Sequence, residues 1–413
     1  MHTESSAALI HEPAALDGLA AELAAAPAIG LDTEFLRERT YRAQLCLLQA
    51  ATPGRAVCID PLALDSLAPL AAAFGAGGPV KVLHAARQDL EVLWIATGRV
   101  SPLFDTQVAA ALAGFPAQVG YAELVRQLLG HELAKAHTRT DWSRRPLSAA
   151  QLEYALDDVR YLLPLRDALL ERLDRLGRSA WLAEELDSLA DPAAFEVDPD
   201  EAWRRLKGVQ ALDPGRQRLA KSLAAWRERR AIDRNRPRGW ILDDASLKEI
   251  VASVPRDAAG LAAVEGLPAG VAQRSGAELL ELVRAAAIDD PPPPLPRRAR
   301  PDPEWTAAVK RLGEVTREAA AAADISAEVL APRRELERLA AGEREVGVLR
   351  GWRRGVVGER LLEALRVVGP ALPACSLTSI CASPRSASAA SSRCVTSSMS
   401  ASASIMRSRP CAV

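Results

Sequence analysis

The chain has 413 residues, more than one ordinary domain needs, so two or three domains with separate cores are expected. Hydrophobic residues make up 49% of the sequence and aromatic residues only 4%, which favours helices and one modest sheet over an all-β architecture. The net charge of -1 excludes a global electrostatic attraction to nucleic acid, so any such binding must come from local clusters of charge.

The sequence also lacks the patterns of a secreted or membrane protein. No basic N-terminal stretch precedes an apolar segment, and no uninterrupted run of about 18 apolar residues occurs. None of the six cysteines forms a C-x-x-C pair, so neither a zinc site nor a redox motif is predicted. We therefore expect a soluble, cytoplasmic protein.

The first part of the chain predicts an α/β domain with a mixed sheet over residues 1–190. Closely spaced apolar runs predict strands at 28–32, 41–51 and 56–60. Another strand is expected at 80–84, and helical periodicity predicts helices at 64–74, 88–97, 106–113, 121–129 and 148–176. Strands followed by strand–helix alternation are typical of an α/β fold.

The second part predicts helical units separated by linkers. Acidic and proline residues at 191–200 end the first domain, and helical periodicity follows over 201–287. The sequence PPPPLP lies in 288–303, which cannot continue a helix and is expected to be an extended linker. Helical periodicity returns over 304–370. The Ser, Ala, Cys and Arg composition of 371–413 predicts a disordered or non-native tail, because it offers too little apolar surface to offset its ordering entropy.

Two carboxylates follow the first predicted strand with one residue between them. Side chains alternate along a strand, so Asp32 and Glu34 point to the same face, with Cα atoms roughly 7 Å apart. Two anions so placed repel each other unless a cation lies between them. Taken alone the pair also fits two solvated surface acids.

Two further elements carry candidate residues. Asp89 falls in the first turn of a predicted helix, where capping the helix N-terminus is the simpler explanation of a single acid. Tyr154 and Asp158 are spaced at i and i+4, so a phenol and a carboxylate share one helix face, while Asp157 points elsewhere.

These four acids and one tyrosine together fit a two-metal phosphodiesterase site. Carboxylate oxygens suit Mg²⁺ or Mn²⁺, and two such ions can activate a water and stabilise a departing oxygen. Asp32, Glu34, Asp89 and Asp158, with Tyr154 beside them, are therefore candidates for one such site.

The three elements resemble the exonuclease motifs of the DEDD superfamily, in the branch with tyrosine four residues before the last aspartate. Longer strings narrow the resemblance to ribonuclease D: LDTEF at 31–35, QLCL at 44–47, LHA at 83–85, FDTQ at 104–107 and RTDW at 139–142. The resemblance implies an RNase H-like 3′→5′ exonuclease domain that releases nucleoside 5′-monophosphates. It also implies catalytic roles for all five residues: Asp32, Glu34, Asp89 and Asp158 would hold the two metal ions, and Tyr154 would orient the attacking water.

The first helical unit is locally basic. Between Arg204 and Arg238 there are twelve Lys or Arg residues against three acids, and exposed guanidinium groups can bind phosphates without sequence preference. A solvated helix face would explain the charge alone. The stretch from Leu223 to Asp243 resembles the HRDC module of RecQ-type helicases and ribonuclease D, which favours RNA binding; 304–370 is expected to be a second, weaker HRDC-like unit.

The expected substrate is RNA with a free 3′ end, with tRNA precursors as the favoured class, and no pattern indicates an obligate protein partner. A DNA-directed 3′→5′ exonuclease and a catalytically inactive nucleic-acid-binding protein stay open as alternatives. Two other polar residues are given structural roles: His84 is expected to be packed at a strand end, and Asp105 to cap the helix that follows it.

Overall fold

The computed structural model of the chain describes residues 9–133, 140–191, 195, 197–287 and 302–366. The predicted tail at 371–413 and most of the predicted linker at 288–303 lie outside these residues. Among the described helices, none combines the length and the apolar character that a membrane span requires.

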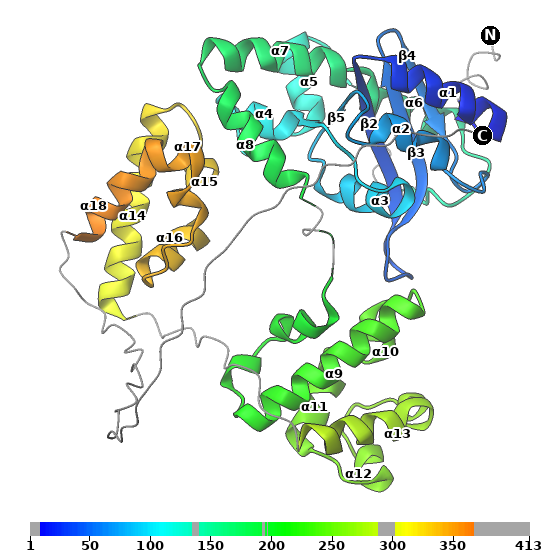
Figure 1. The fold of residues 1–413 in the computed structure, drawn as a ribbon, viewed down its shortest axis with the longest axis vertical. Coiled ribbons are helices and arrows are strands. Elements are labelled where there is room, and N and C mark those ends of the chain that lie inside the picture. The colour runs from blue at the N-terminus through cyan, green and yellow to red at the C-terminus, as the bar shows by residue number, and fades with distance from the viewer. Residues whose placement is uncertain (1–8, 134–139, 192–194, 196, 288–301, 367–413) are drawn as a thin grey trace, which may run out of the picture. The chain divides into compact units, whose positions relative to one another are not determined.

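Six strands form one mixed sheet in the order β1-β4-β3-β2-β5-β6 (Figure 1). The strands are β1 (Leu9–Ile10), β2 (Ala28–Leu36), β3 (Gln44–Thr52), β4 (Arg55–Ile59), β5 (Val80–Leu83) and β6 (Leu103–Asp105). β3 is antiparallel to both β2 and β4, and the remaining pairs are parallel. The predicted mixed α/β sheet is confirmed. β1 and β6 were not predicted, because two or three residues are too few to show the alternation of apolar and polar side chains that is typical of a strand.

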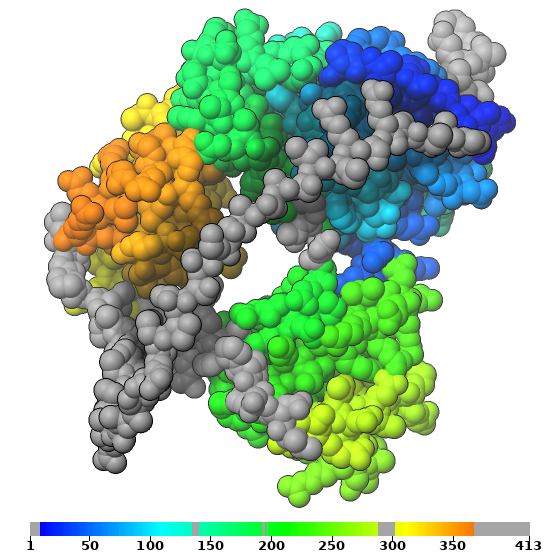
Figure 2. Space-filling model, viewed as in Figure 1, coloured from blue at the N-terminus to red at the C-terminus, as the bar shows by residue number. Residues whose placement is uncertain are grey.

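Helices cover both faces of this sheet. One face is covered by α1 (Pro13–Ala25), α2 (Ala71–Phe74) and α3 (Arg87–Thr97), and α1 forms part of the outer surface turned toward the viewer (Figures 1 and 2). The apolar residues of β2 that point to this side include Ile29 and Leu31, both fully buried. Asp32 and Glu34 therefore leave β2 on the opposite face, toward the helices α4 (Thr106–Leu112), α5 (Tyr121–Leu129), α6 (Ala149–Arg160), α7 (Leu162–Arg175) and α8 (Ser179–Leu189).

The prediction of one continuous helix at 148–176 was wrong. The chain breaks at Tyr161 between α6 and α7. Pro164 has no N–H to donate to the carbonyl of Arg160, and its ring would clash with that carbonyl in a continuous helix. The helix expected at 64–74 is also reduced to a 3₁₀ turn and the four-residue α2.

The first helical unit has a hydrophobic core of its own. It contains α9 (Pro214–Asp233), α10 (Arg238–Ile241), α11 (Asp244–Ser253), α12 (Ala258–Ala262) and α13 (Ala269–Ala286). Trp203, Leu223, Leu247 and Leu279 lie at the centre of this core, all at most 1% exposed. Because the core closes within the unit, the unit has the packing of a separate domain.

The C-terminal helical unit is packed differently. Its helices are α14 (Pro303–Ala322), α15 (Ala327–Leu330), α16 (Arg333–Ala340), α17 (Gly351–Arg353) and α18 (Glu359–Arg366). Leu312 and Leu330 belong to the same apolar core as Leu112 and Leu169 of the α/β domain. Trp352 stacks on Trp181 of α8 at 4.4 Å between ring centroids, and its indole N–H donates to Glu185 at 2.7 Å. The C-terminal unit thus completes the core of the α/β domain.

Candidate active site

β2 carries two of the five candidate residues on the face that α6 covers. The strand continues past Asp32 as far as Leu36, so Glu34 lies within the strand and keeps the alternation that places both carboxylates on one side. The register with β3 shifts between Glu34 and Phe35, which ends the regular pairing directly after the second carboxylate.

α6 is held over β2 by three local features. A capping box starts the helix, in which the Ser148 hydroxyl accepts from the Gln151 N–H and the Gln151 side chain accepts from the Ser148 N–H. Gly30 permits the close approach, since a Cβ there would lie 3.2 Å from the Val159 carbonyl oxygen. Arg145, just before the helix, donates to both oxygens of Asp60 at 2.6 and 2.7 Å and ties the segment to the sheet.

Three carboxylates meet where α6 crosses β2. Ligand atoms of Asp32, Glu34 and Asp158 all lie within 4.8 Å of one another, and they form the one such group found among the described residues. Burial raises the pKa of Glu34 to about 8 and that of Asp158 to about 6, and repulsion between the acids adds to the shift of Glu34. The pKa of Asp32 is also raised well above its usual value, first by burial and then by the charge of Asp89.

Asp89 lies next to this group and is held from the other face of the sheet. Its carboxylate accepts a 2.5 Å hydrogen bond from the Thr33 hydroxyl, and Thr33 alternates with Asp32 and Glu34 on β2. Burial raises the pKa of Asp89 to about 6. Four crowded, partly desolvated carboxylates favour a divalent cation, because a cation offsets the repulsion that raises their pKa values. The donor set therefore fits divalent metal ions.

Tyr154 lies one helical turn before Asp158 and bonds to its carboxylate. Burial, followed by the charge of Asp158, raises the pKa of the phenol far above neutral pH. The ring stacks on Trp142, with 6.2 Å between centroids. Because Tyr154 stays protonated, it can donate and accept hydrogen bonds but cannot act as a general base near pH 7.

His84 and Asp105 have the structural positions that the sequence indicated. His84 Nε2 lies 3.0 Å from the Val119 carbonyl oxygen, and Nδ1 lies 2.9 Å from the Thr106 hydroxyl, so the ring is packed and bonded at both nitrogens. Asp105 caps α4 by accepting from the N–H groups of Gln107 and Val108.

Asp105 has a second role that sequence reasoning missed. It also accepts from the N–H groups of Ala85 and Ala86, at 3.2 and 2.8 Å, in the turn between β5 and α3. Ala85 has φ of 56°, a left-handed conformation that alanine rarely adopts. Asp105 thereby fixes the turn that places Asp89, and no sequence signal distinguishes this role from simple capping.

The comparisons with known proteins match the α/β domain and the first helical unit to two separate families. Residues 8–174 match the family model described as 3'-5' exonuclease, and residues 216–283 match the HRDC domain. Ribonuclease D of Acidiphilium cryptum is 43% identical over 374 residues, which cover 87% of this chain and 93% of that protein. The chain belongs to the ribonuclease D family.

Further relatives agree with this assignment. Ribonuclease D of Gluconacetobacter diazotrophicus is 42% identical, over 84% of this chain and 90% of that protein. The crystal structure of Escherichia coli RNase D, an exoribonuclease involved in structured RNA processing, matches with a TM-score of 0.79 and 31% identity, over 87% of this chain and 98% of that one. The predicted family, the exonuclease and HRDC folds and the 3′→5′ exoribonuclease activity are thus confirmed.

The stability of the metal-free ribonuclease D fold should fall as the pH rises. Folding raises the pKa of Glu34 from 4.5 to about 8 and that of Asp158 from 3.8 to about 6. The folded state therefore binds more protons than the unfolded state between about pH 4 and pH 8, and stability is lost across that window. In EDTA we expect a lower melting temperature at pH 7.5 than at pH 5.5, and Mg²⁺ should stabilise the protein more at pH 7.5. A Glu34→Gln variant should show a weaker pH dependence, and an unchanged dependence would contradict the electrostatic account.

Removing the hydroxyl of Tyr154 should slow cleavage even at saturating Mg²⁺. We expect Tyr154→Phe to lower kcat by about tenfold to a hundredfold, because the phenol orients a reacting group while the carboxylates stay in place. The dissociation constant for Mg²⁺, measured by calorimetry, should also rise by about tenfold, because the phenol is the outer hydrogen-bond partner of Asp158. Since the phenol does not ionise near neutral pH, the shape of the pH–rate profile between pH 7 and pH 9 should also persist.

Proposed function

We propose that this exoribonuclease shortens the 3′ ends of tRNA precursors, with two divalent ions, Mg²⁺ or Mn²⁺, held by Asp32, Glu34, Asp89 and Asp158. The proposal rests above all on the three carboxylates whose ligand atoms lie within 4.8 Å, with Asp89 adjoining them. The TM-score of 0.79 to an exoribonuclease involved in structured RNA processing supports the substrate class.

Each side chain has a distinct task in this proposal. When bound, two such ions activate a water molecule and stabilise the leaving oxygen in an in-line displacement. The carboxylates hold the site, and Thr33 fixes the orientation of Asp89 through its 2.5 Å hydrogen bond. Tyr154 donates to Asp158, which leaves its oxygen lone pairs to accept a hydrogen bond from the attacking water and orient it.

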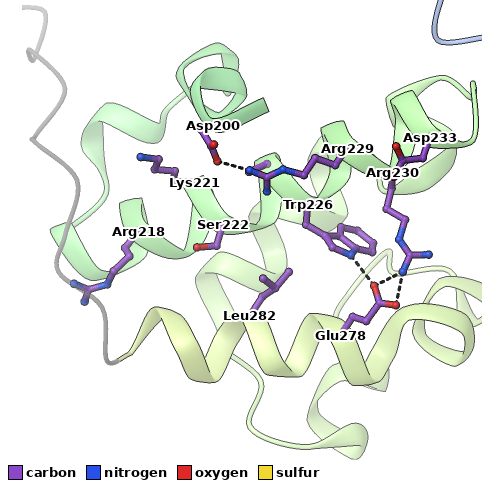
Figure 3. A pocket seen from close by; sticks show the side chains of 11 residues that line it. Asp200, Arg218, Lys221, Ser222, Trp226, Arg229, Arg230, Asp233, Glu278 and Leu282 are labelled. Atoms are coloured by element: carbon purple, nitrogen blue, oxygen red, sulfur yellow. Dashed lines mark hydrogen bonds and ion pairs between the residues drawn. The ribbon is translucent and has the colours of Figure 1, made fainter. Parts of the chain in front are cut away.

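We assign RNA holding to a cleft in the HRDC domain. The cleft of about 550 Å³ lies between α9 and α13 and is lined by Arg218, Lys221, Trp226, Arg229 and Arg230, among others (Figure 3). The sequence stretch that predicted exposed guanidinium groups also contains Arg227, and there the prediction was wrong. Arg227 is 4% exposed and donates to the Leu242 carbonyl and to Asp244, so it holds the fold together.

Lys221 and Arg229 can bind an RNA phosphate at little cost in lost ion pairs. The Arg229–Asp200 ion pair measures 2.7 Å, but both side chains are more than half exposed, and such a pair contributes only about 0–1 kcal/mol. Within the described residues Lys221 has no ion pair or hydrogen bond. Arg230 lies over the Trp226 ring at 5.5 Å, and both bond to Glu278, which makes this side of the cleft rigid.

Charge removal in the cleft tests the RNA-holding assignment. Lys221→Ala combined with Arg229→Ala should weaken RNA binding and lower the salt slope of log K by about two, one for each lost phosphate contact. Cleavage of a trinucleotide, which needs only the active site, should keep its kcat. Arg333→Ala removes an exposed, ion-paired arginine of α16 and serves as the control. Equal losses in the control and the double variant would contradict a specific cleft.

The substrate is tested with a tRNA precursor that carries a 3′ extension. We expect stepwise shortening at single-nucleotide resolution, release of nucleoside 5′-monophosphates and dependence on Mg²⁺ or Mn²⁺. Blocking the 3′ hydroxyl should stop the reaction. Faster digestion of a matched DNA oligomer would favour the DNA-directed alternative, and RNA binding without any cleavage would favour the inactive one.

A further inference from the structure

Gln49 is a buried side chain whose polar atoms lack partners. It lies in the middle of β3 and is 0% exposed. Neither its amide nitrogen nor its carbonyl oxygen has a hydrogen-bond partner in the described structure. Buried amides normally have partners, because a primary amide loses its bonds to water on folding. An apolar residue would fill this position without that cost.

The register of the sheet places Gln49 beside the carboxylate cluster. Gln49 is paired directly with Asp32 across β2 and β3, so both side chains leave the same face of the sheet, with Cβ atoms about 4.5–5.5 Å apart. On its other side it is paired with Cys58 of β4, a buried thiol. The polar neighbour that this register supplies is therefore Asp32.

Asp32 also differs from its neighbours in how it is supported. Asp158 bonds to Tyr154, and Asp89 accepts from Thr33. Among the described residues no side chain donates a hydrogen bond to Asp32. Burial raises the pKa of this carboxyl more than its backbone hydrogen bond with Thr33 lowers it. Metal-binding carboxylates are themselves hydrogen-bonded as a rule, since the outer partner fixes the orientation of the ligand.

We propose that Gln49 is a positioning residue for the divalent-ion site. In the occupied site, the Gln49 amide would donate to one oxygen of the Asp32 carboxylate, directly or through one ordered water. This bond would fix the orientation of Asp32 and leave its other oxygen available as a metal ligand beside Glu34 and Asp158. This inference rests on the proposed metal site, and it assigns to Gln49 the support for Asp32 that Tyr154 and Thr33 give to the other two aspartates.

The test is the Mg²⁺ affinity of Gln49→Met, a variant of similar shape without the amide. We expect the dissociation constant for Mg²⁺, measured by calorimetry on the full chain without RNA, to rise by about tenfold. The half-saturating Mg²⁺ concentration for cleavage should rise in parallel, while kcat at saturating Mg²⁺ changes by less than about threefold. The melting temperature in EDTA should stay level or increase, because two unpartnered polar atoms are removed.

Two companion variants keep the result decisive. Leu47→Met changes the same face of β3 two residues away, opposite Glu34, and should leave Mg²⁺ affinity unchanged. Gln49→Asn keeps the amide on a shorter side chain and should bind Mg²⁺ with intermediate affinity. If Gln49→Met does not fold, Gln49→Asn still tests whether the amide supports Mg²⁺ binding. Mg²⁺ affinity within twofold of the original in every folded Gln49 variant overturns the inference.

Failure of the metal site itself gives a different pattern. If Asp32→Asn binds Mg²⁺ as well as the unsubstituted chain, the proposed metal site is wrong and the role of Gln49 falls with it. If Asp32→Asn loses Mg²⁺ but Gln49→Met does not, only the positioning role is wrong. In the double variant Gln49→Met should cause no further loss, because its effect acts through Asp32.

Discussion

Replacing Asp32 with asparagine should reduce exonuclease activity by a thousandfold or more, about 4 kcal/mol of transition-state stabilisation. Asp32 contributes to the group of three carboxylates and is the member whose pKa is raised by all of the other acids. An amide cannot supply the negative charge that two divalent cations require. The measurement is the single-turnover rate on a 3′-extended RNA at saturating Mg²⁺.

The same variant should be more stable than the original protein when metal is absent. Burial and the neighbouring acids disfavour the Asp32 carboxylate in the metal-free folded state, and asparagine removes that carboxylate. We therefore expect a higher melting temperature in EDTA together with the loss of activity, and unchanged RNA binding through the HRDC domain. A less stable, inactive Asp32→Asn protein would instead indicate a structural role.

A chain ending at residue 287 should lose most of its stability. The C-terminal helices contribute Leu312, Leu330 and Trp352 to the core that α4, α7 and α8 share. Fully burying each large apolar side chain contributes about 1.5–3 kcal/mol, so their joint loss exceeds about 4 kcal/mol. We expect the melting temperature to fall by about 10 °C or more, or the protein to aggregate. Thermal unfolding followed by circular dichroism measures this effect.

Two smaller changes test whether the loss of stability comes from the shared core or from the rest of the C-terminal region. Ending the chain at residue 371 should leave the melting temperature unchanged, because the Ser-, Ala-, Cys- and Arg-rich sequence of 372–413 offers too little apolar surface to add to a core. Trp352→Ala should reproduce part of the loss, since it removes the stack on Trp181 and the bond to Glu185. Full stability and activity in the chain ending at 287 would show that the C-terminal helices are dispensable to the nuclease.

The sequence by itself determined the chemistry and the class of fold. The spacing of Asp32 with Glu34, and of Tyr154 with Asp158, follows from the periods of a strand and a helix, so local geometry alone put each pair on one face. The family strings then joined these pairs to Asp89. The sequence also predicted that the HRDC domain is a separate unit, because a composition rich in proline marks the boundary that follows it, and the structure gives this unit its own core.

Only the tertiary structure decided which polar residues serve the site and which serve the fold. Asp105 was predicted to cap a helix but also fixes the Ala85 turn. Arg227 belongs to the stretch that was expected to expose its guanidinium groups, but it is buried against Leu242. Gln49 shows no signal at all until the register pairs it with Asp32. Such roles depend on contacts between segments distant in sequence, and helix and strand periods carry no information about those contacts.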